Sequence, residues 1–115
     1  NNAAWALFEN KDNRALSFIE KAWKLQPTNA AILDSYGWIL ANQGRPSEGV
    51  QYLRKASALA PDNPDIQWHL AYALYLAGDV TVARRELSSL LNSGRTFGDM
   101  EKAKQLISQL STTQR

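Results

Sequence analysis

Hydrophobic residues recur along this chain with the spacing of α-helices. The clearest segment carries its apolar residues at one-, three- and four-residue intervals, at Ile32, Leu33, Tyr36, Ile39 and Leu40. Such spacing places the side chains on one face of a helix. Segments of this kind alternate with Gly, Pro and Asn, and together they predict an all-α chain with helices over 1–9, 12–25, 30–43, 46–59, 64–77, 80–92 and 99–110.

The residues that interrupt these segments return at one fixed interval. Pro27 and Pro61 lie 34 residues apart. The same step relates Asn10, Gly44 and Gly78, then Ala15, Gly49 and Ala83, then Ile19, Leu53 and Leu87, and then Ala22, Ala56 and Leu90. Gly or Asn suits the left-handed residue after a first helix, Pro ends a second helix, and small residues let two helices cross closely. The pattern predicts antiparallel helix pairs stacked one after another.

With Gly or Ala at Ala3, Gly37 and Ala71, this period resembles the tetratricopeptide repeat (TPR) family. The resemblance implies a TPR α-solenoid of about two and a half repeats with a C-terminal capping helix. Arg95 in the proline column and Leu90 in a small-residue column mark the end of the array. We therefore expect a TPR domain over 1–110, divided into a partial repeat 1–29, a complete repeat 30–63, a last repeat 64–93 and a cap 97–110, followed by a flexible tail 111–115.

Three stretches carry a narrower likeness. The segment LDSYGWILANQG, the segment ALAPDNPDIQWHLAYALYLAGD and the closing GRTF resemble C-terminal repeats of large bacterial TPR proteins. Some of these are lipoproteins of exopolysaccharide and exosortase (PEP-CTERM) systems. The likeness favours the periplasmic side of a bacterial envelope over the cytoplasm, although localisation itself stays unknown. Because the start of the chain reads as the middle of a helix, we also expect a longer parent protein and an exposed N-terminal end able to self-associate.

Family members line their concave inner wall with the first helix of each pair, and the resemblance implies which residues face it here. The implied partner-binding residues are Asp34, Trp38, Asn42, Asp65, Trp68, Tyr72 and Tyr75, beside Ala4, Leu7, Phe8, Ala41 and Leu76. Trp and Tyr dominate binding hot spots, so an aromatic wall favours a protein or peptide ligand. Two alternatives stay open. The rings could pack over one another and only thicken the core, as is expected for Trp5 and Trp23, and Asp65 could simply complement its helix dipole.

Composition narrows the remaining functions. The 13 basic and 11 acidic residues leave a net charge of +2 without a dense basic run, which disfavours nucleic-acid binding. With no Cys, one His and no nucleotide or metalloprotease motif, neither an enzyme nor a cofactor nor a metal site is predicted. His69 is interpreted as a surface or packing residue, and Ser35, Asp65 and His69 replace the Lys, Arg and Asn with which some TPR domains grip a carboxylate.

The preferred hypothesis is a scaffold that binds a peptide or helix of a partner protein in the concave groove, without insertion into a membrane. One alternative is an architectural or self-associating segment of a larger bacterial envelope protein. A groove that stacks on the sugar rings of a glycan is the other alternative.

Overall fold

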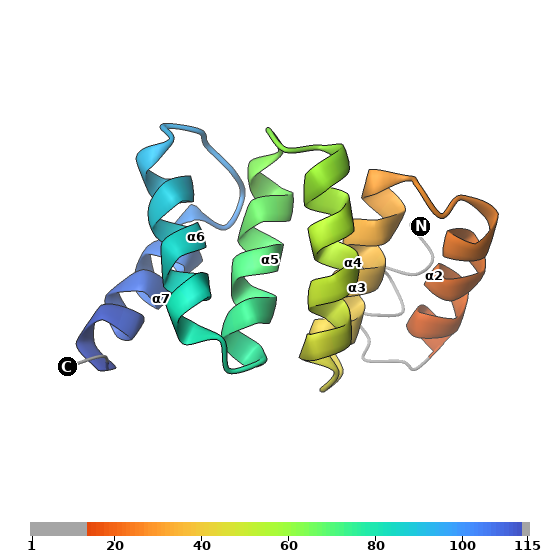
Figure 1. Cartoon of the computed structure of the whole chain (residues 1–115), viewed down its shortest axis with the longest axis horizontal. Helices are drawn as coiled ribbons and strands as arrows, with labels where there is room; N and C mark the ends of the chain where they lie inside the picture. The colour runs from red at the N-terminus through yellow and green to blue at the C-terminus, as the bar shows by residue number, and fades with distance from the viewer. Residues whose placement is uncertain (1–13, 114–115) are drawn as a thin grey trace.

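The computed structural model describes residues 14–113, and within that range all regular secondary structure is helical. The helices are α2 (Arg14–Leu25), α3 (Ala30–Asn42), α4 (Pro46–Leu59), α5 (Pro64–Leu76), α6 (Val80–Asn92) and α7 (Met100–Thr113). They pack in chain order, so that α2 and α7 lie at opposite ends of the array (Figure 1). Neighbouring helices are antiparallel, which confirms the prediction of an all-α repeat array. The predicted helix 1–9 lies outside the described residues.

The ends of the helices follow from the residues found there. Asn29 Oδ1 accepts a hydrogen bond from the Ile32 amide (3.1 Å), and Asn63 Oδ1 accepts from the Ile66 amide (3.2 Å), so each caps the start of a first helix. Gly44 and Gly78 have φ of 84° and 90°, the left-handed conformation predicted for the turn within each pair. The Asn and Gly residues that separate the helical segments therefore form the caps and turns of the repeats.

The last helix differs from the prediction at its end. α7 continues to Thr113, whereas the sequence predicted a helix ending at 110 and a tail from 111. The physical reason is that no Gly or Pro follows residue 110 to stop the helix. Its inward face, formed by Ala103, Leu106 and Leu110, is buried. α7 is thus longer than expected, and it covers the last helix pair through these three residues.

The tightest contact between helices joins the two members of the central pair. A Cβ atom placed on Gly49 of α4 would lie 2.5 Å from the Gly37 carbonyl oxygen of α3, closer than real Cβ contacts. A Cβ on Gly37 would lie 2.6 Å from Leu53 Cγ. Ala15 and Ala83, in the same column as Gly49, are fully buried. The predicted close crossing at these small residues is confirmed.

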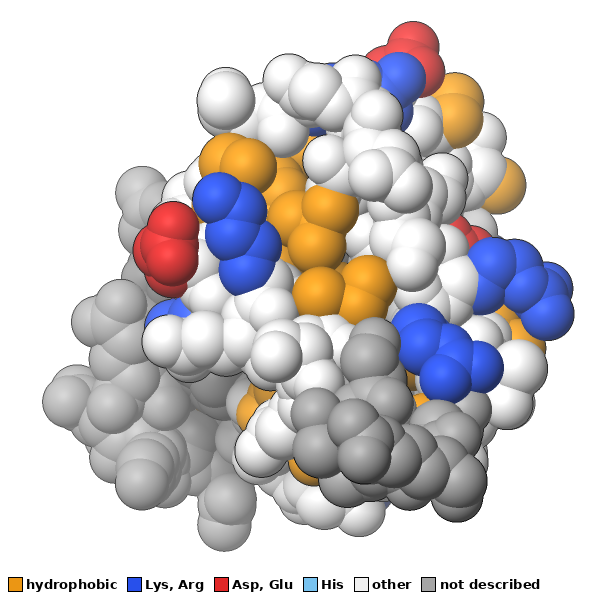
Figure 2. All heavy atoms as spheres, turned by 90° about the vertical axis from the view of Figure 1, so that its left-hand side faces the viewer, with side chains coloured by type: hydrophobic (Ala, Val, Ile, Leu, Met, Phe, Trp, Pro, Cys, Tyr) orange, Lys and Arg blue, Asp and Glu red, His pale blue; other side chains and the backbone are white. Residues whose placement is uncertain are grey.

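The hydrophobic core continues past the last pair into α7. Leu90, which replaces a small residue of the repeat pattern, is fully buried in one cluster with Ala103, Leu106 and Leu110. Figure 2 looks onto this end of the array, where hydrophobic side chains reach the surface between Lys and Arg side chains. This end of the array therefore presents both apolar and basic side chains at its surface.

Three aromatic rings form what we call the α2–α4 cluster: Trp23 of α2, Tyr36 of α3 and Tyr52 of α4. Tyr36 and Tyr52 stack with ring centroids 4.3 Å apart, and the Trp23 ring lies 5.7 Å from the first and 5.6 Å from the second. Burial, helped by the neighbouring Tyr52, raises the pKa of the Tyr36 hydroxyl to about 12. Trp23 packs into this cluster as predicted, and Trp5 lies outside the described residues.

Candidate functional site

A pocket of about 420 Å³ opens on the side of the array formed by α3, α5 and α7. α3 and α5 are the first helices of successive pairs, so the pocket lies where the resemblance placed the concave wall. We call it the groove. Its lining residues are Trp38, Asn42, Trp68, Tyr72, Tyr75, Asp99, Lys102, Gln105, Leu106 and Gln109.

One wall of the groove is a continuous row of aromatic rings. Tyr72 lies at the centre, with ring centroids 5.4 Å from Trp38, 5.5 Å from Trp68 and 6.1 Å from Tyr75. Trp38, Tyr72 and Tyr75 are half-buried, so each keeps part of its ring at the surface. Rings held in this way present apolar area without the rotamer freedom of exposed side chains. The structure therefore brings together three predicted anchors.

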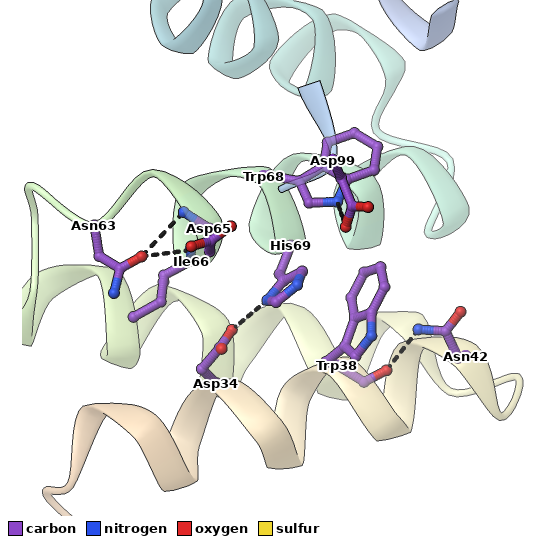
Figure 3. Close-up of polar contacts among 9 residues, drawn as sticks. All are labelled: Asp34, Trp38, Asn42, Asn63, Asp65, Ile66, Trp68, His69 and Asp99. Carbon is purple, nitrogen blue, oxygen red and sulfur yellow. Dashed lines mark hydrogen bonds and ion pairs between the residues drawn. The ribbon is translucent and has the colours of Figure 1, made fainter. Parts of the chain in front are cut away.

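Trp68 corrects the sequence prediction. Its side chain is only 3% exposed, and it belongs to the hydrophobic core cluster that includes α7. Its indole Nε1 donates a hydrogen bond to Asp99 Oδ2 at 3.2 Å, so the segment before α7 covers the ring (Figure 3). The prediction of a ring open to solvent is wrong for Trp68, because the sequence did not reveal that Asp99 folds onto it. Trp68 forms the floor of the groove.

Asp34 is also engaged within the chain. Its Oδ1 lies 2.7 Å from His69 Nδ1, and the two side chains are 16% and 14% exposed. The imidazole in turn stacks on the Trp38 indole, with centroids 4.2 Å apart and planes at 27° (Figure 3). His69 is thus a packing residue, as interpreted from the sequence, and the structure adds Asp34 as an acid positioned beside it. Asp34 orients His69, and His69 supports Trp38 from behind.

Asn42 and Asp65 have separate positions. Asn42 is exposed and lines the groove, and it donates from Nδ2 to the Trp38 carbonyl oxygen at 2.8 Å, which leaves its amide oxygen pointing away from that helix (Figure 3). Asp65 is exposed in the first turn of α5, where its amide donates to Asn63 Oδ1 at 3.0 Å. It is absent from the groove lining. The helix-dipole alternative therefore describes Asp65 better than a place on the wall.

α7 supplies the wall that sequence reasoning missed. Lys102, Gln105 and Gln109 line the groove from this helix, with Asp99 just before it. The sequence predicted a capping helix over 97–110 and gave its polar residues no place in the groove. The signal was available, because a helix that follows the last pair in register occupies the place of a further first helix and so presents its polar face to the groove.

The charges around the groove are paired with one another. Lys102 Nζ lies 3.7 Å from Asp99 Oδ1, and Asp34 faces His69. Among the described residues, no group of three His, Asp or Glu side chains could hold a metal ion. No helix in residues 14–113 is both long and apolar enough to span a membrane. The groove is thus a nearly neutral surface of rings and amides, suited to contact binding.

Comparison with known proteins places these features in a family context. The model of the tetratricopeptide repeat family matches residues 40–110. A TPR repeat-containing protein of Pseudomonas aeruginosa is 45% identical over 56 residues, which are 49% of this chain and 9% of that protein. Cellulose synthase operon protein C of Pseudomonas fluorescens is 32% identical over 97 residues, which are 84% of this chain and 7% of that protein. The chain therefore spans only a small fraction of either bacterial relative.

Proposed function

This chain belongs to the tetratricopeptide repeat family, and we propose that it holds a segment of a partner protein in the groove between α3, α5 and α7. Domains of this family are in general protein-interaction modules and are typically not catalytic. The finer proposal concerns the mode of binding. Trp38, Tyr72 and Tyr75 act as anchors, Asn42 as a polar contact, and Trp68 as the floor that holds the anchors in place.

The observation that carries this proposal is the half-burial of three adjoining rings on the rim of one pocket. A ring that only completes a core can be buried almost completely, as Tyr36 is at 7% exposed. A ring that is exposed and packs against no neighbour has no fixed orientation. Trp38 stacks on His69 and also contacts Tyr72, with centroids 4.2 Å and 5.4 Å away. Rigid aromatic surface that still contacts water is the property shared by binding hot spots.

The two alternative functions are an architectural role and glycan binding. The family also builds architectural arrays, and the predicted self-association through the N-terminal end involves residues outside the described range. A glycan-binding groove is favoured by the combination of rings and amides and by the relative named for the cellulose synthase operon. That relative and the P. aeruginosa protein are both bacterial, and we propose a bacterial origin for this chain as well. We further propose that it is located in the bacterial envelope.

The test removes two anchors and leaves the floor in place. A Trp38→Ala, Tyr75→Ala variant and the unmodified chain are used to capture proteins from an extract of the source organism. Affinities for each purified candidate are then measured by calorimetry. We expect the variant to lose at least about 2 kcal/mol of binding free energy, or about 30-fold in Kd, because hot-spot rings are removed.

A Tyr52→Ala variant is the matched control, because it removes one half-buried ring of the α2–α4 cluster, remote from the groove lining. It should keep the Kd of the unmodified chain at a temperature where both are folded. Equal capture by the groove variant and the unmodified chain would contradict the proposal. If the unmodified chain and the groove variant form the same oligomers, the architectural alternative is favoured instead.

A further inference from the structure

We propose that the groove selects an extended, uncharged peptide segment with one bulky apolar side chain, held between the aromatic wall and the polar face of α7. This inference rests on the proposed function and names the class of partner segment. It assigns α7 a role in recognition, beyond its role in covering the core. Three observations support it, namely the size of the groove, its charge balance and the amides that line it.

The size of the groove favours an extended segment over a helix. One turn of α-helix with its side chains is about 10–12 Å across and about 5.4 Å high, and so occupies roughly 400–600 Å³. The groove offers about 420 Å³ between α3 and α7, about the volume of one such turn. A helix that binds through several turns would place only one face in it. An extended segment needs less width and can place one side chain against the rings while the chain continues on both sides.

The charge balance disfavours a charged ligand. Each carboxylate of this region is engaged, Asp99 with the Trp68 indole and Lys102, and Asp34 with His69. A basic peptide would have to displace one of these contacts, and an acidic peptide or a C-terminal carboxylate would meet a lysine already beside Asp99. Neither exchange contributes much binding free energy, because one ion pair only replaces another. An uncharged segment leaves all of these contacts intact.

The amides supply what an extended main chain requires. A helix satisfies its own backbone N–H and C=O groups, whereas an extended segment brings unpaired donors and acceptors into the groove. Gln105 of α7 carries both a donor and an acceptor, and within residues 14–113 its side chain makes no hydrogen bond. Across the groove, the Asn42 amide nitrogen donates to the Trp38 carbonyl, so its oxygen is left to accept. The two walls therefore offer main-chain contacts on either side of the aromatic anchors.

The experiment selects ligands without assuming their identity. A phage-displayed library of random linear peptides is selected against the unmodified chain, and parallel selections use the Trp38→Ala, Tyr75→Ala, the Gln105→Ala and the Lys104→Ala variants. Lys104 is the matched control, because it neighbours Gln105 on α7, is exposed and pairs with Glu101 outside the groove lining. Selected peptides are then synthesised, and their Kd values are measured at low and high salt.

We expect the selected peptides to share one aromatic or large aliphatic residue flanked by uncharged residues. Their Kd should stay constant with salt, because screening does not affect uncharged contacts. Gln105→Ala should weaken binding about three- to tenfold, the effect of one lost hydrogen bond, and Lys104→Ala should leave it unchanged. The double groove variant should select no such consensus.

Several results would overturn the inference and leave the proposed function standing. These are a consensus rich in charges, apolar residues at helical spacing, or binding that is unaffected by Gln105→Ala but lost in the double groove variant. If the unmodified chain enriches no peptide above the double variant, both the inference and peptide binding in the groove are wrong. A cello-oligosaccharide that quenches tryptophan fluorescence in the unmodified chain but not in the double variant would assign the groove to a glycan.

Discussion

The two aromatic clusters of this protein use the same residue types for different ends. In the α2–α4 cluster, Tyr36 is only 7% exposed, and its stacking with Tyr52 joins the two helices of one pair. In the groove, Trp38 and Tyr72 belong to the first helices of successive pairs, and their half-buried rings line a pocket. Half-buried rings occur in both clusters. What separates them is that the groove rings line a pocket, whereas the rings of the α2–α4 cluster pack on one another and are absent from its lining.

Trp68 shows how fine this distinction is. It lies on the same wall as Tyr72, yet the segment carrying Asp99 folds over it and turns an expected anchor into a floor. Tyr72, one helical turn along α5, is not covered by that segment and stays half-buried. A ring on a concave wall is therefore an anchor or a core residue depending on contacts made by a segment about one repeat away in the sequence.

The largest expected effect is on the buried cluster. Tyr36→Ala should lower the free energy of unfolding by about 3–5 kcal/mol, as for other large buried aromatic residues, because it leaves a cavity between α3 and α4. Urea denaturation followed by circular dichroism measures this. The affinity of the folded protein for its partner should not change. A loss below about 1 kcal/mol would show that the α2–α4 cluster is not a packing unit.

The same cluster predicts a dependence on high pH. Burial raises the pKa of Tyr36 to about 12 from its ordinary value of 10.0, so the folded state holds the hydroxyl proton more tightly than the unfolded state. The stabilisation is complete below pH 10 and is lost as the pH rises through 12, by about 2–3 kcal/mol at most. Stability should be measured between pH 9 and roughly pH 12. Tyr36→Phe should remove this part of the decline, and an identical pH profile in both proteins would contradict the prediction.

The floor of the groove should respond more weakly to a conservative change. Trp68→Phe keeps most of the apolar surface but removes the indole donor to Asp99, which should cost about 1–2 kcal/mol of unfolding free energy. The Asp99→Asn variant keeps an acceptor and should cost less. Thermal unfolding by calorimetry distinguishes the two. Equal stability of Trp68→Phe and the unmodified chain would mean that the contact with Asp99 does not hold the segment before α7.

The smallest expected effect concerns the support of Trp38. Asp34→Ala removes the contact that orients His69, and should cost about 1 kcal/mol of stability and weaken partner binding two- to threefold. Glu48→Ala is the control, because it breaks the exposed Arg45–Glu48 pair and should change neither quantity measurably. Chemical denaturation and fluorescence titration give the two values. An effect of Glu48→Ala as large as that of Asp34→Ala would remove any special role for the Asp34–His69 pair.

The repeat period made most of the fold predictable. The helix ends are set by local residues, namely Gly44, Gly78 and the asparagine caps, and such residues can be recognised in the sequence alone. The site was only partly predictable, because its key contacts join residues in different repeats. Asp34 meets His69 across 35 positions and Trp68 meets Asp99 across 31, intervals close to the repeat length. Such pairs become visible only when neighbouring repeats are placed side by side with their true twist.

The most direct test follows the indole N–H signals of the chain by nuclear magnetic resonance as a groove-binding partner is added. Each of the four Trp residues gives one such signal, assigned by single Trp→Phe substitutions. We predict that the Trp38 signal moves in proportion to the bound fraction, while the Trp23 signal stays in place. Movement of the Trp23 signal with an unchanged Trp38 signal would contradict the claim that the groove rings, and not the α2–α4 cluster, form the partner site.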